Sequence, residues 1–143
     1  MAEPIAIATL AVTLTITILI LRLSHWHTTP AFITTATKAS HGWLPNISLL
    51  VTTSIIGPIA EELVFRSVLY GWLRRHMLPM GSAIISAACF SIVHGVSVRS
   101  LSFFLTGLVL AWAYERSGSI FPAIIIHGTF NATAYALIKV ILA

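Results

Sequence analysis

The chain has 143 residues, of which 57% are apolar and only 8% are charged. Soluble globular domains carry about 25% charged residues, so a chain this poor in charge cannot cover a soluble surface. The net charge of +4 comes from scattered Lys and Arg rather than from a basic block, which excludes the clustered patch typical of nucleic-acid binding. The composition therefore predicts an integral membrane protein whose surroundings are a lipid bilayer.

The first apolar run, residues 5–23, is predicted to be a transmembrane helix. It lacks a basic n-region, is too long for the apolar core of a signal peptide, and no A-x-A site follows it. A long connection over residues 24–42 comes next, and Trp26 with Trp43 suits the membrane interface. Residues 1–42 are therefore interpreted as an N-terminal span followed by an interfacial loop.

Four more apolar runs follow, and two of them are short for a helix that needs roughly 20 residues to cross the hydrocarbon. We expect an all-α, polytopic membrane protein of about five transmembrane helices, forming a single domain over residues 1–143. Lys and Arg divide almost evenly between the two sides, so the orientation stays open. The four predicted spans are about Trp43–Leu73, Met80–His94, Leu101–Tyr114 and Ile120–Leu142.

The stretch GPIAEELVFRS, residues 57–67, places charged groups inside the second of these spans. Glu62 and Arg66 are four residues apart and share one helix face, in the order that favours an ion pair. Glu61 points about 100° away from Glu62 and has no partner on its own helix. A carboxylate of this kind in a membrane span is costly and usually marks function.

Pro58 is the other unusual residue of this stretch, because proline breaks or kinks a helix and suits a first turn. If a helix restarts at Pro58, Glu61 and Glu62 lie near its N-terminus, whose dipole favours a charged carboxylate. Burial favours the neutral form instead, and the sequence does not decide the balance. A carboxylate poised between the two forms is suited to act as a general base.

Two further polar groups lie in later spans. FSIVH, residues 90–94, ends the third span with His94, and HGTFN, residues 127–131, carries His127 and Asn131 one turn apart. Two hydrogen-bond donors one turn apart can hold an oxyanion. These groups can also simply join neighbouring helices, as polar membrane residues often do. Their occurrence on three separate helices favours a polar chamber inside the membrane that serves as a site.

Several protease chemistries are excluded by the residues that the chain lacks. It has no aspartate for an aspartyl dyad, no H-E-x-x-H and no G-x-S-G loop, and Cys89 is off-face from His94. A carboxylate, imidazoles and an amide remain, and such a set can activate water directly. In this interpretation Glu61 takes the proton, His94 positions the water or protonates the leaving amine, and His127 with Asn131 holds the oxyanion.

The three motifs together resemble the CPBP family, the CaaX proteases and bacteriocin-processing enzymes also called the Abi family. EELVFR matches E-E-x-x-x-R, FSIVH matches F-x-x-x-H and HGTFN matches H-x-x-x-N, in order on separate helices over about residues 45–142. Each motif alone is weak, but the three in order are specific. Many members carry more helices before the glutamate motif than this chain does.

The resemblance implies an all-helical glutamate-type intramembrane endopeptidase without cofactor or metal, with residues 43–143 as the protease core. It implies a peptide or protein substrate at the membrane and a location in a membrane, for which the compact size favours a prokaryotic cell. The implied site residues are Glu61 as the water-activating base, Glu62 and Arg66 as its support, His94 as an assisting group, and His127 with Asn131 as the oxyanion hole.

Other functions stay open at this point. The chain can be a non-catalytic immunity or scaffold protein that captures a peptide in the same chamber. Glu61, His94 and His127 can also be read as zinc ligands, with Glu62 as a spare. A proton-coupled transporter is disfavoured because no inverted repeat is visible. The substrate can be a prenylated C-terminus, a bacteriocin or pheromone precursor, or a surface protein with a sorting tail, and the oligomeric state is open.

Overall fold

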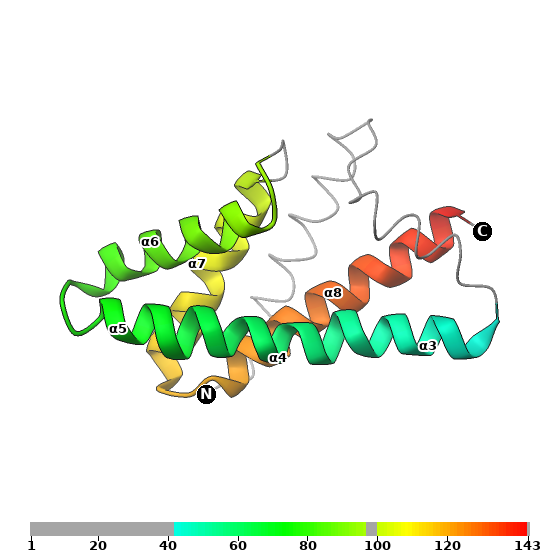
Figure 1. Ribbon diagram of the computed structural model, residues 1–143, viewed down its shortest axis with the longest axis horizontal. Helices are drawn as coiled ribbons and strands as arrows, with labels where there is room; N and C mark the ends of the chain where they lie inside the picture. The colour runs from blue at the N-terminus through cyan, green and yellow to red at the C-terminus, as the bar shows by residue number, and fades with distance from the viewer. Residues whose placement is uncertain (1–41, 97–99, 143) are drawn as a thin grey trace.

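The computed structural model describes residues 42–96 and 100–142, and the regular structure in these ranges is entirely helical (Figure 1). The all-α prediction is therefore confirmed for this part of the chain. The predicted first span, residues 5–23, and nearly all of the interfacial loop lie outside the described residues.

One long helix runs without a break from Trp43 to Leu73, over 31 residues. Its limits agree with the predicted second span. The hydrogen-bond pattern alternates between α-helical and π-helical along its length. The successive parts are α3 Trp43–Val51, η1 Thr52–Ile56, α4 Gly57–Glu62, η2 Leu63–Tyr70 and α5 Gly71–Leu73.

The helix does not restart at Pro58. The backbone stays in the right-handed helical region through Gly57, and the turn before the proline widens instead. The Gly57 N–H bonds to Thr52 O, five residues back, which is the π-helical pattern. A wider turn accommodates a ring that would clash with the carbonyl four residues earlier. Glu61 and Glu62 therefore lie inside a continuous helix and not at a new N-terminus.

The π-helical turns also explain which face of the long helix is buried. Pro58, Glu62, Arg66 and Tyr70 are all buried and follow one another at intervals of four residues. In a pure α-helix this interval drifts by ~40° per step, because a turn holds 3.6 residues. A π-turn holds more residues, so alternating the two types keeps the four side chains facing the other helices.

Three further helices complete the described fold: α6 Pro79–Val93, α7 Ser100–Ser117 and α8 Phe121–Leu142. Helices α6 and α7 pack side by side, and α8 crosses the long helix at η1 and α4 (Figure 1). Glycine permits the close approach of α6 and α7, because a Cβ at Gly107 would lie 2.9 Å from Ala87 Cα.

A polar clamp joins the end of the long helix to the end of α7. Arg74 Nη2 lies 2.9 Å from Glu115 Oε1, and Arg74 Nε also donates to the same carboxylate. The Tyr70 hydroxyl donates to Glu115 Oε2 at 2.9 Å. Hydrogen bonds from the Arg74 guanidinium hold the pKa of Glu115 below its usual value. This clamp fixes how the two helices meet at the end remote from the histidines.

Among the described helices, Trp43–Leu73 and the segment Phe121–Val140 are long and apolar enough to cross a membrane. Helix α6 is apolar but has only 15 residues, and α7 does not meet the same measure. The structure thus supports two of the five predicted spans by length and composition. The apolar side chains that the long helix leaves exposed include Ile55, Ile56, Val64, Val68 and Trp72.

Candidate active site

The pair Glu62–Arg66 forms the buried base of the site, as the spacing predicted. Both side chains are completely buried, and Arg66 Nε lies 2.9 Å from Glu62 Oε2. Arg66 Nη1 also donates to Ser86 Oγ at 2.9 Å, and that hydroxyl donates to Phe65 O. Because each charge has its partner at contact distance, the pair is tolerated in an apolar interior.

Glu62 has a second partner that the sequence did not predict. Its Oε1 lies 2.9 Å from Nδ1 of His127, a side chain of α8 that is only 4% exposed. One oxygen of Glu62 therefore faces the arginine and the other fixes the imidazole. This contact sets the orientation of the ring, so that its Nε2 faces Glu61 Oε2 at 3.7 Å.

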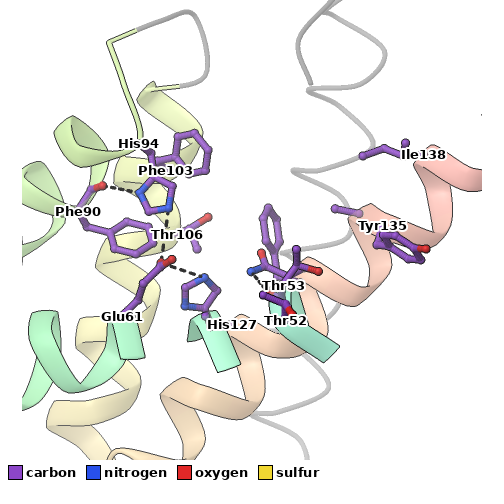
Figure 2. Close-up of a pocket in the computed structure, with 14 residues that line it drawn as sticks. Thr52, Thr53, Glu61, Phe90, His94, Phe103, Thr106, His127, Tyr135 and Ile138 are labelled. Atoms are coloured by element: carbon purple, nitrogen blue, oxygen red, sulfur yellow. Dashed lines mark hydrogen bonds and ion pairs between the residues drawn. The ribbon is translucent and has the colours of Figure 1, made fainter. Parts of the chain in front are cut away.

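Glu61 finds its partners on other helices. Its Oε2 lies 3.5 Å from His94 Nε2 and 3.7 Å from His127 Nε2, and its side chain is 34% exposed. Figure 2 shows the carboxylate of Glu61 below the ring of His94 and beside that of His127. The Oε2 atom is itself buried and has no direct hydrogen bond among the described residues. The two imidazoles that face Glu61 thus come from other parts of the chain than its own helix.

His94 is held by one hydrogen bond and two aromatic rings. Its Nδ1 lies 2.8 Å from Phe90 O, and its ring stacks on Phe103 with centroids 4.5 Å apart and planes inclined by 27°. The Phe90 ring lies on it as well, also with a centroid separation of 4.5 Å. The two neighbouring rings and the fixed Nδ1 leave Nε2 directed at Glu61 (Figure 2).

The hydrogen-bond partners fix the tautomers of both histidines. A backbone carbonyl only accepts, so Nδ1 of His94 carries the hydrogen. Glu62 faces Arg66 as a carboxylate, so Nδ1 of His127 carries a hydrogen too. In neutral rings both Nε2 atoms would then present lone pairs to Glu61 Oε2. This arrangement calls for an additional proton, or a water molecule that donates hydrogens, between the three groups.

Asn131 lies one turn beyond His127 on α8, as predicted, but its amide already has a partner. Its Nδ2 donates to Thr53 O, a main-chain carbonyl of η1, at 2.8 Å. An amide nitrogen carries two hydrogens, so the second N–H is available to another acceptor. Asn131 thus anchors α8 to the long helix and also lines the cavity.

These groups line a cavity of about 300 Å³, a volume within the range of small-ligand sites. The polar groups gather at one part of it, while aromatic and aliphatic side chains of α8 line another. Thr106 of α7 adds a hydroxyl to the wall, which the sequence reasoning did not single out (Figure 2). The lining residues are Thr52, Thr53, Gly57, Glu61, Phe90, His94, Phe103, Thr106, His127, Phe130, Asn131, Ala134, Tyr135 and Ile138.

All six predicted site residues thus lie in one connected cluster, four of them at the cavity and Glu62 and Arg66 beneath it. The sequence analysis missed Phe103, Ser86 and the carbonyl of Thr53. A serine among apolar residues of a span is a signal that could have indicated Ser86. No pattern distinguishes Phe103 from the other apolar residues of its helix. Within residues 42–96 and 100–142, no group of three or more His, Cys, Asp or Glu is arranged to hold a metal ion.

Comparison with known proteins assigns more than half of the chain to one protein family. Residues 42–133 match the family described as "Type II CAAX prenyl endopeptidase Rce1-like". The chain belongs to this family, and the resemblance to the CPBP proteins drawn from the three motifs is confirmed. No solved structure matches the chain.

Two bacterial relatives illustrate the relationship. The chain is 28% identical over 101 residues to "UPF0177 protein YxdF" of Lactococcus lactis subsp. lactis (strain IL1403), which covers 70% of this chain and 55% of that protein. It is 31% identical over 83 residues to "Putative membrane peptidase YdiL" of Bacillus subtilis (strain 168), and this match covers 58% of this chain and 34% of that protein. The chain thus spans about a third to half of the length of these relatives.

Proposed function

We propose that this protein is an integral membrane endopeptidase of a bacterial cell that uses Glu61 to activate water. The observation that carries the proposal is the pair of imidazole Nε2 atoms directed at Glu61 Oε2, 3.5 and 3.7 Å away, at the wall of a cavity. The family membership and the name of the Bacillus relative support a peptidase. The two apolar helices that are long enough to cross a membrane support a location in a membrane.

In the proposed reaction, a water molecule lies between Glu61, His94 and the scissile carbonyl. Glu61 takes one proton as the water oxygen bonds to the carbonyl carbon. The tetrahedral intermediate collapses when the C–N bond breaks, and the same proton passes to the leaving nitrogen, directly or through His94. One water is consumed and one carboxylic acid and one amine are formed, so no covalent enzyme intermediate is needed.

The oxyanion is stabilised in this proposal by His127 and Asn131. Since Nδ1 of His127 donates to Glu62, its Nε2 can donate only if the ring carries both hydrogens. The Glu62 carboxylate fixes the orientation of this ring, as an acid partner does for a catalytic imidazole. The second Nδ2 hydrogen of Asn131 supplies the other donor. Hydrogen-bond donors of this kind are worth roughly 10²–10³ in rate each.

The substrate is proposed to be a peptide or protein precursor that reaches the cavity at the membrane surface. Its test compares the N-terminal and C-terminal peptides of membrane and surface proteins in wild-type and Glu61→Gln cells at equal abundance of the protein. Glu115→Gln is the matched control, because Glu115 lies in the clamp with Arg74 and outside the cavity. Uncut precursors should accumulate with Glu61→Gln alone. The opposite outcome is that Glu61→Gln cells show no change in any terminus and behave like wild type, whereas cells without the protein show a phenotype. The protein would then bind peptides without cutting them.

A further inference from the structure

The long helix lacks one backbone donor beside the site, because residue 58 is proline. In η1 the Gly57 N–H bonds to Thr52 O, five residues back. In the same register the next carbonyl, Thr53 O, would take the N–H of residue 58, and in an α-helical register Ser54 O would take it. Residue 58 is proline and has no N–H. Pro58 therefore removes the one N–H that Thr53 O would accept in the π-helical register that Gly57 shows, or Ser54 O in the α-helical register.

Helix α8 occupies the place beside these two carbonyls. Asn131 Nδ2 donates to Thr53 O at 2.8 Å. One turn earlier, Gly128 lies so close to the helix that a Cβ there would overlap Ser54 O. Any residue larger than glycine would hold α8 further away. The carbonyls beside Pro58 thus coincide with the closest approach of the helix that carries His127.

We propose that Pro58 is a positioning residue, which keeps the carbonyl of Thr53 open so that it fixes the amide of Asn131 in the cavity. The inference rests on the proposed function, because it assigns the fixed amide to the oxyanion. One N–H of Asn131 is held by Thr53 O, and this bond sets the direction of the other. A residue with an N–H at position 58 would compete for Thr53 O or Ser54 O and release the amide.

A direct readout of this contact is available because the chain contains only two asparagines, Asn46 and Asn131. Protein labelled with ¹⁵N-asparagine gives two side-chain amide signals in detergent micelles, and Asn131→Ala assigns them. In Pro58→Ala the Asn131 amide protons should shift toward the position of a free amide and exchange faster with solvent. Alanine is the best helix former, so this variant should fold. Pro58→Gly is the second variant, and it introduces the same backbone N–H at position 58.

Pro122→Ala is the matched control. Pro122 lies in the first turn of α8, where the N–H groups have no helical acceptor in any case. The Pro122→Ala variant should leave the Asn131 signal and the activity unchanged.

In Pro58→Ala we expect kcat to fall about tenfold with KM little changed, as a small misplacement of a catalytic group can cause. In an Asn131→Ala background the same substitution should have almost no further effect.

Three results would overturn the inference. An Asn131 amide signal that is the same in Pro58→Ala and wild type would show that the proline does not hold this contact. Full activity in Pro58→Ala, or an equal loss in the Asn131→Ala background, would show that the contact does not serve the reaction. If the wild-type protein cuts no peptide, the proposed function fails separately, and the amide signal still decides whether Pro58 places Asn131.

Discussion

Glu62 Oε1 lies 2.9 Å from His127 Nδ1, while its other oxygen lies 2.9 Å from Arg66 Nε. The buried carboxylate of Glu62 thus pairs with Arg66 on its own helix and also orients the imidazole of His127, 65 residues away in the chain. Glu61, its neighbour in the chain, faces the same imidazole from the cavity side. The adjacent glutamates therefore have different surroundings: Glu62 belongs to a fixed, buried network, and Glu61 lines the cavity.

Removing the charge of Glu62 should damage folding as well as activity. Glu62→Gln leaves the Arg66 guanidinium buried without a counter-charge, which typically costs about 3–5 kcal/mol. The double variant Glu62→Gln/Arg66→Met removes both charges. Its unfolding temperature should be well above that of Glu62→Gln and close to that of wild type. The double variant should stay inactive, because the His127 ring no longer has a carboxylate at Nδ1. Recovery of activity in the double variant would show that Glu62 serves the arginine alone.

Gly128→Ala should separate α8 from the long helix. The added methyl group would overlap Ser54 O, and overpacking of this kind costs about 1–3 kcal/mol. Gly81→Ala is the control, because a Cβ there would meet Met77 Sδ at an ordinary 3.5 Å. Thermal unfolding in detergent should show a lower midpoint for Gly128→Ala only. Equal midpoints for the two variants would contradict the close contact at Ser54.

Phe103 should matter for the reaction although it has no polar group. Its ring stacks on His94 at 4.5 Å, and removal of the stack in Phe103→Leu frees the imidazole to turn. We expect roughly a tenfold loss of kcat without a change in membrane insertion. Phe103→Tyr keeps the stacked ring and should retain most of the activity. A loss of the same size in both variants would indicate a packing defect instead.

The clamp between Arg74 and Glu115 should make the stability of the protein depend on pH in the acid range. Because Arg74 lowers the pKa of Glu115 in the folded state, the clamp contributes fully above the usual glutamate pKa of about 4.3. Its contribution is lost as the pH falls through the lower, folded-state pKa. Unfolding temperatures of wild type and Glu115→Gln should converge toward low pH. A constant difference between them across this range would contradict the ion pair.

Removal of metal distinguishes a zinc-dependent protease from the proposed glutamate-type protease. In the proposed glutamate-type reaction no metal takes part, so activity should survive prolonged treatment with a strong chelator. Elemental analysis should find far less than one zinc per chain. Loss of activity that zinc alone restores would favour the zinc-dependent protease over the glutamate-type reaction.

Much of this site follows from the sequence because its parts are local. The limits of the long helix come from the apolar run, and the Glu62–Arg66 pair comes from a spacing of four residues. The contact of Glu62 with His127 does not follow from the sequence, because it depends on how two distant segments cross. The sequence also left open whether a helix restarts at Pro58, since a π-turn that absorbs a proline leaves no pattern in the sequence.

The most direct test of the account uses purified protein and one precursor that accumulates in Glu61→Gln cells. Cleavage of this precursor by wild-type and Glu61→Gln protein in proteoliposomes is followed by mass spectrometry, with the fold of both checked by thermal unfolding. The account predicts that the wild-type protein cuts at one peptide bond and that Glu61→Gln, folded to the same extent, is slower by at least about 10³-fold. Cleavage by the folded variant at the wild-type rate would contradict the role of Glu61 as the base that activates water.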